Sequence, residues 1–431
     1  MKLIKQTMRR IFFFAAAVAA ALPPLAAHAA LEQPLAAEQF AACVQSLAEQ
    51  TGRAQRPLSR EDFLQIASAG KYDDRVRQSM LVTTTEPTYW WDELAATTDA
   101  QRVEEGRAVL ARGREVLQRI EQRFGVPKEI VVALYGIETN YGPARGRIPV
   151  LDSSLSLACL RPCANPEGTC AARERAFAAV RLLRDRKVRP EEFQGSWAAA
   201  FGRTQFVPDT FEQLAVDFDG DGMADVVGSE PDAWASTANH LARRGGWTAG
   251  APVYVEVRVP PDQQPAFTGK GGATVRQPER RRKASDWAAE GWQAVNPAGL
   301  AVPLQVAGDP ELYPFAPVGL PGPVFLVSRN FQTLWRYNQS ERYAMEVALL
   351  ADKIAGGPGI VTPWPTDDPG LTRAQVRELQ EWLVARGHAQ VVPDGVPGRN
   401  TRDAIEAERA KAGLPPGRRV GQRTMRLLMG M

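Results

Sequence analysis

With 431 residues the chain is long enough for two or three domains, and its 44% hydrophobic and 23% charged residues are typical of a folded protein rather than a disordered one. The formal charge of +3 depends on four basic residues near the N-terminus. Without those four, 48 of the 52 Lys and Arg residues remain against 49 Asp and Glu residues, which gives a net charge of −1. This balance excludes nucleic-acid binding driven by overall positive charge.

The N-terminal segment predicts a secretory signal peptide. Four basic residues (Lys2, Lys5, Arg9 and Arg10) precede an apolar run over residues 11–22, and small residues follow over 26–30. We expect cleavage after Ala29 or Ala30, which makes residues 1–29 the leader. An uncleaved membrane anchor is the alternative, although the apolar run is short for a spanning helix. No cysteine lies at this junction, so a lipid anchor is not indicated.

The chain has four cysteines: Cys43, Cys159, Cys163 and Cys170. In an exported protein an even number of cysteines predicts disulfides, and four cysteines allow three pairings among which the sequence does not choose. A zinc site is the alternative, but the cysteine spacings do not match common zinc motifs and no histidine lies nearby.

Helical periodicity dominates after the leader, so the expected fold class is mainly α. We expect helices over residues 101–124, 127–140, 171–184, 232–244 and 340–355.

Residues 251–323 differ from the helical segments in their alternating apolar pattern and frequent Gly and Pro, and they predict a small β-rich insertion. We expect strands over residues 253–259, 303–306 and 324–327, and we expect the basic run 280–283 to be a solvated loop.

Residues 356–370 are rich in Pro and Gly and predict a linker. Beyond it, residues 371–431 predict a small helical domain, with helices over 372–386 and 402–412 around a turn at 394–401. No transmembrane helix is expected after the leader.

A single carboxylate, Glu138, lies near the end of the helix expected over 127–140. Val131, Leu134 and Tyr135 precede it by seven, four and three residues, so they share its face of the helix. A carboxyl group on an apolar face has a raised pKa and stays protonated near neutral pH, as a general acid acting on a glycosidic oxygen requires. The alternative is a glutamate that only caps the helix or forms a salt bridge.

Two further stretches suit a sugar site, which combines aromatic rings with a few placed polar groups. The first, residues 195–211, contains Ser196, Gln205, Trp197, Phe201 and Phe206. The second, residues 337–344, begins a helix with Tyr337, Asn338 and Tyr343. Taken alone, the first stretch could equally be a core helix that ends in a turn, and the second could equally be a helix cap with packed tyrosines.

Three motifs, GIETNYG, GSWAAAFGRTQFVP and YNQSERYAMEVALLADKI, follow the export signal in this order. Over residues 35–355 the chain resembles the membrane-bound lytic transglycosylase B family of peptidoglycan-cleaving enzymes. The resemblance implies a lysozyme-like, mainly helical catalytic domain over residues 30–355, with Glu138 as the single catalytic residue. We expect the glycan cleft to be lined by Ser196, Gln205, Phe206, Tyr337, Asn338 and Tyr343.

The family's chemistry explains how one carboxylate suffices. Glu138 protonates the oxygen between N-acetylmuramic acid and N-acetylglucosamine, and the sugar's own N-acetyl group stabilises the developing charge. Glu138 then takes the proton from the C6 hydroxyl, which closes a 1,6-anhydro ring. Ser196 and Asn338 are expected to hold the N-acetyl group.

Two alternative functions are a muramidase that hydrolyses the same bond with water and a non-catalytic cell-wall-binding protein. A zinc amidase or peptidase lacks a metal-ligand motif here, and a serine hydrolase lacks a histidine base and a G-x-S-x-G sequence.

The stretch DFDGDGMAD, residues 217–225, carries most of an EF-hand loop, but Gly228 stands where the closing glutamate is expected. Family members carry a longer loop closed by a later aspartate. The resemblance therefore implies structural Ca²⁺ held by Asp217, Asp219, Asp221, the Met223 carbonyl and Asp232, with Glu230 as a rival closing ligand. The alternative is an acidic, glycine-rich turn without a metal, and no organic cofactor is expected.

The tail over residues 371–428 resembles a three-helix peptidoglycan-binding domain, which would keep the enzyme near an insoluble polymer. The stretch ERAKAG departs from the family's usual aromatic-Gln pair, and His388 is expected on the surface. The expected location is the periplasm. The expected partners are peptidoglycan glycan strands and cell-wall synthesis proteins, without nucleic acid or a membrane span.

Overall fold

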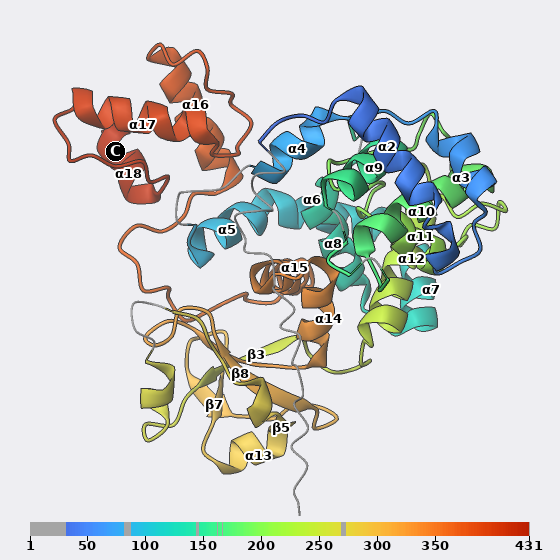
Figure 1. The fold of residues 1–431 in the computed structure, drawn as a ribbon. Coiled ribbons are helices and arrows are strands. Elements are labelled where there is room, and N and C mark those ends of the chain that lie inside the picture. Colours follow the sequence, from blue (N-terminus) through green and yellow to red (C-terminus); the bar gives the residue numbers. More distant parts are fainter. Residues whose placement is uncertain are drawn as a thin grey trace, which may run out of the picture.

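The computed structural model describes residues 32–81, 88–143, 146–161, 163–165, 167–268 and 273–430 (Figure 1). The predicted signal peptide and its cleavage site therefore lie outside the described residues. Helices dominate the described part, which confirms the predicted fold class. Within these ranges no helix combines the length and apolarity that a bilayer span needs.

The N-terminal helices pack against the middle of the chain. Contacts join α9 and α10 to one another and to the earlier helices. The bounds are α2 (Ala37–Ala48), α3 (Arg60–Ala67), α4 (Asp74–Leu81), α5 (Trp90–Thr97), α9 (Val150–Leu160), α10 (Ala171–Arg184) and α11 (Pro208–Leu214). The core that α2, α3, α9 and α10 share includes Phe63 and Phe177, whose rings meet edge to face with centroids 5.5 Å apart.

Two disulfides fix the pairing that the sequence left open. Cys43 of α2 joins Cys159 of α9, and Cys163 joins Cys170. All four cysteines are used in these bonds, so the alternative of a zinc site is wrong.

The single helix predicted over 101–124 is two helices, α6 (Ala100–Arg112) and α7 (Arg114–Phe124). The break falls at Gly113, where an added Cβ would lie 2.7 Å from the ring of Trp234. The glycine therefore lets α12 (Glu230–Asn239), which carries Trp234, pack closely against the junction.

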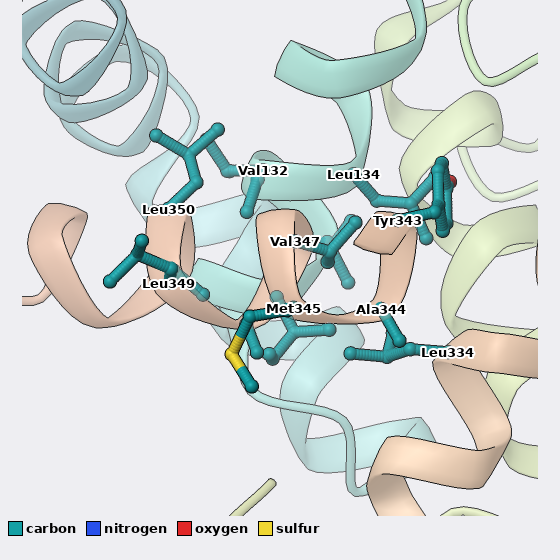
Figure 2. Packing of buried hydrophobic residues seen from close by; sticks show 14 of the residues in the cluster. Val132, Leu134, Leu334, Tyr343, Ala344, Met345, Val347, Leu349 and Leu350 are labelled. Carbon is teal, nitrogen blue, oxygen red and sulfur yellow. The ribbon is translucent and has the colours of Figure 1, made fainter. Parts of the chain in front are cut away.

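Helix α8 (Lys128–Thr139) packs against α15 (Glu341–Ile354) in the largest core (Figure 2). Val132 and Leu134 of α8 meet Val347 and Leu350 of α15, and all four side chains are buried. The predicted helices at 127–140, 171–184 and 340–355 are confirmed within about one residue at either end. The helix predicted over 232–244 is α12 followed by a π-helical turn, η2 (His240–Gly245).

The β-rich region forms one antiparallel sheet of seven strands (Figure 1). The order is β4-β8-β9-β3-β6-β7, with β5 paired to β8. The bounds are β3 (Tyr254–Arg258), β4 (Val275–Arg276), β5 (Arg282–Lys283), β6 (Gln293–Val295), β7 (Ala301–Pro303), β8 (Glu311–Ala316) and β9 (Val324–Val327). The sheet therefore includes β9, which lies beyond residue 323. Separately, β1 (Ile148–Pro149) pairs with β2 (Gln194–Gly195).

Two expectations in this region need correction. The strand predicted over 303–306 ends at Pro303, which has no N–H to continue the ladder with β6. The basic run 280–283 is not a solvated loop. The guanidinium carbons of Arg280 and Arg282 lie 5.0 and 4.0 Å from the ring centroid of Trp287, a buried residue of α13 (Ala284–Ala289).

The C-terminal region has its own core and three helices, α16 (Arg373–Ala385), α17 (Arg399–Lys411) and α18 (Gln422–Met429). The two predicted helices here are confirmed, and α18 completes the set of three. His388 is not a surface residue, because its side chain is 12% exposed and its Nε2 lies 2.9 Å from Glu408 Oε1.

These C-terminal helices dock on the larger helical region. Arg373, at the start of α16, pairs with Asp99 at 3.0 Å and donates from Nη1 to Asn140 Oδ1 at 2.6 Å. Arg419 pairs with Asp92 of α5 at 2.8 Å. The intervening residues 356–370 form no helix or strand, but two of their backbone N–H groups, at Val361 and Thr362, donate to the Glu256 carboxylate.

Candidate active site

Glu138 lies in the last turn of α8, which ends at Asn140 in the left-handed conformation with φ 57°. Val131, Leu134 and Tyr135 are fully buried, as the helical spacing predicts. Glu138 itself is half-buried, so its carboxyl lies at the boundary between the core and solvent.

A tyrosine from α15 holds this carboxyl. The Tyr343 hydroxyl donates to Glu138 Oε1 at 2.5 Å. Tyr343 is in the first turn of α15, where its backbone N–H is capped by the Ser340 hydroxyl. The structure therefore brings the first and third sequence motifs into direct contact.

A second tyrosine joins the remaining motif. Tyr337, in the last turn of α14 (Arg329–Asn338), stacks on Tyr343 with ring centroids 6.1 Å apart and planes 8° apart. Its hydroxyl donates to the Thr204 carbonyl at 2.7 Å, in the loop of the second motif. All three predicted motifs thus converge beside Glu138.

The surroundings set the protonation of these groups. Burial raises the pKa of Glu138 to about 7. The Tyr343 hydrogen bond opposes that rise, and the nearby Glu346 carboxylate adds to it. Burial and the Glu138 charge raise the pKa of Tyr337 and Tyr343 well above the ordinary value, so both phenols stay neutral donors.

Glu346 is a second acid that sequence reasoning missed. It is buried on α15, and burial together with the Glu93 carboxylate raises its pKa to about 7. Its position three residues after Tyr343, on the same helix face, was the available signal.

We predict that Glu346→Gln lowers the pKa of Glu138, since it removes a negative charge that favours the protonated acid. The alkaline limb of a pH–rate profile of glycan cleavage should then move to lower pH, because Glu138 must be protonated to donate. Glu341→Gln is the matched control: Glu341 is on the same helix but pairs with Arg276 at 2.7 Å. An unmoved limb in Glu346→Gln would show that Glu346 does not tune the acid.

The loop of the second motif is shaped by its own polar groups. The Ser196 hydroxyl accepts from the backbone N–H groups of Ala198 and Ala200, both at 3.2 Å. Gln205, with φ 52°, donates from Nε2 to the Gly202 carbonyl at 2.9 Å. Both side chains are half-buried, so part of each faces solvent.

The structure places the other predicted substrate residues differently. Phe206 is 2% exposed and lies in a hydrophobic core with Phe201, so the expectation that its ring faces the glycan is wrong. Trp197 is half-buried, and Asn338 is exposed at the end of α14. An aromatic residue among glycines and alanines can serve as a platform or as core, and the sequence could not separate the two.

The acidic loop brings three of its predicted ligands together. Carboxylate oxygens of Asp217, Asp219 and Asp232 lie within 4.8 Å of one another, and Asp221 is not part of this cluster. Asp232 is buried and accepts backbone N–H groups from Phe218 at 2.7 Å and from residue 225 at 2.8 Å. Burial and the Asp219 carboxylate raise the pKa of Asp232, a repulsion that a bound cation would relieve.

Glu230 is not a rival ligand. Its carboxylate pairs with Arg112 at 2.6 Å and accepts from the Tyr135 hydroxyl at 3.1 Å. It is therefore engaged with α6 and α8 rather than with the acidic cluster. Asp221 accepts from the Met223 backbone N–H at 2.8 Å, within the loop itself.

A half-buried acid on α8 bonds to Tyr343 of α15, and Tyr337 of α14 stacks on that tyrosine. In a lysozyme-like fold this arrangement is typical of a glycan-cleaving class of protein. Residues 39–352 match the family described as transglycosylase SLT domain, and residues 372–428 match the putative peptidoglycan binding domain. The chain belongs to the transglycosylase SLT family, which confirms the resemblance drawn from its motifs.

Individual similar proteins are lytic transglycosylases. The chain is 30% identical over 251 residues to the membrane-bound lytic murein transglycosylase B of Escherichia coli K12; this match covers 56% of the chain and 60% of that relative. A similar structure is SltB3 from Pseudomonas aeruginosa, solved in complex with NAG-NAM-pentapeptide, with 34% sequence identity and a TM-score of 0.65. The match covers 90% of this chain and 99% of SltB3. The Escherichia coli lytic transglycosylase Slt35, solved in complex with calcium, has 26% sequence identity to this chain and a TM-score of 0.55. That match covers 73% of this chain and 93% of Slt35.

Proposed function

We propose that this chain is a lytic transglycosylase that cleaves peptidoglycan between N-acetylmuramic acid and N-acetylglucosamine. The observation that carries the proposal is the Glu138 carboxyl, which has a pKa of about 7 and is bonded to Tyr343. A group with that pKa can both give and take a proton near neutral pH. The family match and the relatives' printed activities support the same reaction class.

The proposed reaction uses Glu138 twice. As an acid it protonates the glycosidic oxygen while the C1–O bond breaks, and the substrate's N-acetyl oxygen stabilises the charge at C1. The resulting carboxylate accepts a hydrogen bond from Tyr343. It then takes the C6 hydroxyl proton as O6 bonds to C1, which forms the 1,6-anhydro product and restores the acid. Attack within one sugar ring has an entropic advantage over capture of a water molecule.

The proposed glycan contacts are Ser196, Gln205, Tyr337, Asn338 and Tyr343. Tyr343 bonds to Glu138 and Tyr337 stacks on Tyr343, whereas Ser196 and Gln205 are half-buried and Asn338 is exposed. Ser196 and Asn338 are proposed to orient the N-acetyl group. Phe206 supports this loop from inside, because its ring is in the core.

The test is digestion of purified peptidoglycan by the leaderless protein, with the released muropeptides weighed by mass spectrometry. Products lighter by one water than reducing-end fragments support the transglycosylase. Reducing-end products would instead indicate a muramidase, which needs a second carboxylate as nucleophile or base. Binding to the wall without release would indicate a non-catalytic protein.

We also propose that the acidic loop holds a structural Ca²⁺ through Asp217, Asp219 and Asp232, with Asp221 and the Met223 carbonyl completing the oxygen ligands. Convergence of the three carboxylates supports the site, and Slt35 was solved in complex with calcium. The ion would neutralise the cluster and fix the loop that leads into α12.

This site predicts that Ca²⁺ stabilises the folded protein by about 2.7 kcal/mol when present at 100 times its dissociation constant. Thermal unfolding with Ca²⁺ or with EGTA measures the difference. Asp232→Asn should remove the Ca²⁺-dependent shift, because that carboxylate is the buried member of the cluster. Glu230→Gln, which alters the neighbouring Arg112 pair instead, should keep it. Equal shifts in the two variants would rule out Asp232 as a ligand.

The proposed organisation is a signal peptide over residues 1–29, a catalytic domain over 30–355, a linker over 356–370 and a wall-binding domain over 371–431. Because β9 belongs to the sheet, we propose that the β-rich insertion extends from 251 to 327. Export to the periplasm, where peptidoglycan lies, follows from the predicted leader, and cell-wall synthesis proteins are proposed as further partners.

A further inference from the structure

A separate cavity of about 270 Å³ lies one ring away from the catalytic pair. Tyr337 forms part of its wall. The Tyr337 ring centroid is 4.7 Å from that of His240, another lining residue, and 6.1 Å from that of Tyr343, which holds Glu138. The Tyr337 ring therefore separates the cavity from the catalytic pair, a distance that a few extended residues of a peptide on the bound sugar can span.

The cavity is cationic. Arg244 and Arg336 line it, and no lining residue is Asp or Glu. Among the described residues, the guanidinium groups bond to neutral oxygens: Arg244 Nη1 donates to Thr210 Oγ1 at 2.7 Å, and Arg336 Nη1 donates to the Gly245 carbonyl at 3.1 Å. Both arginines are exposed, so their guanidinium groups are accessible to a ligand.

Two further features indicate a ligand site. His240 Nδ1 is buried and has no hydrogen-bond partner in the described part of the chain, although buried polar atoms are usually paired. The lining residues His240, Arg244 and Gly245 belong to the π-helical turn η2, a local irregularity that is found mostly at functional sites. Burial and the Arg244 charge lower the pKa of His240 to about 4, so it offers a neutral imidazole.

We propose that this cavity binds a carboxylate of the stem peptide carried by the muramic acid under attack. The inference rests on the proposed function, because only a peptidoglycan strand brings such a peptide to Glu138. The peptide is attached to the reacting sugar itself and bears carboxylates, and arginine donors bind carboxylates with charge-assisted hydrogen bonds. The enzyme would then favour strands that still carry their peptides.

The test compares cleavage of two substrates, intact peptidoglycan strands and the same strands stripped of peptides by an amidase, which leaves only the short lactyl carboxylate on each muramic acid. The measured quantity is the kcat/KM for intact strands divided by the kcat/KM for stripped strands. In Arg244→Gln and Arg336→Gln this ratio should fall about tenfold, the effect of one lost charge-assisted bond. Arg336→Lys should recover part of the preference because it keeps the charge.

Arg243→Gln is the matched control. Arg243 is an exposed neighbour in the same helical turn and does not line the cavity. The ratio measured for Arg243→Gln should therefore equal that of the unaltered protein. Equal ratios in all variants, while both substrates are still cleaved, would overturn the subsite and leave the transglycosylase intact. Failure of the unaltered protein to cleave either substrate would overturn both.

Discussion

Glu138→Gln is expected to reduce release of muropeptides by at least about 10³-fold, within the range that a positioned general acid and base contributes. Glutamine keeps the shape of the side chain and can still bond to the Tyr343 hydroxyl, but it cannot donate the proton to the glycosidic oxygen. Mass spectrometry of peptidoglycan digests measures the loss directly.

The pH dependence of the unaltered protein provides a second measurement. A pKa of about 7 at Glu138 means that the protonated acid, and with it the rate, is lost as the pH rises through about 7. Wall binding by Glu138→Gln should be unchanged, because the C-terminal helices have a separate core. Full activity in this variant would disprove the role of Glu138.

Removal of the Cys43–Cys159 disulfide by a double Cys→Ala change is expected to lower the free energy of unfolding by about 4.7 kcal/mol, the value for a closed loop of roughly 100 residues. This bond joins positions 116 residues apart and ties α2 to α9. Without it the unfolded chain gains much more conformational freedom. Urea unfolding of the oxidised protein and the variant measures the change.

The second disulfide is the internal control. Cys163 and Cys170 are only seven residues apart, so their removal should cost about half as much in the same loop-entropy treatment. An equal loss in the two double variants would mean that loop length does not determine the stabilisation. Both measurements require an oxidising buffer, as expected for an exported protein.

The sequence predicted the elements whose signals are local. The apolar face of α8, the caps around α15 and the alternation in β3 depend on neighbours a few residues away, and these elements match the structure closely. The close approach of Trp234 to Gly113 and the contact of Arg282 with the Trp287 ring join residues that are far apart in the sequence or placed by the sheet. Such features require the tertiary partner and could not be deduced from periodicity.

The same distinction applies to the site. Glu138 and Tyr343 followed from motifs. Glu346 lies within the third motif, but its role, like that of His240, depends on its neighbours in space. Phe206 shows the opposite error, since an aromatic residue suited to sugar binding lies in the core. The disulfide pairing also needed the fold, because four cysteines allow three pairings equally.

The docking of the C-terminal helices changes what the wall-binding domain can contribute. Arg373 bonds at once to Asp99, which caps the start of α6, and to Asn140, which ends α8 two residues after Glu138. A binding surface fixed in this way cannot search around the cleft as a freely tethered one would. The two sites reinforce each other only on a polymer whose own spacing fits both. We therefore expect the protein to favour strands whose spacing fits both sites, and a strand with the wrong spacing to bind at one site alone.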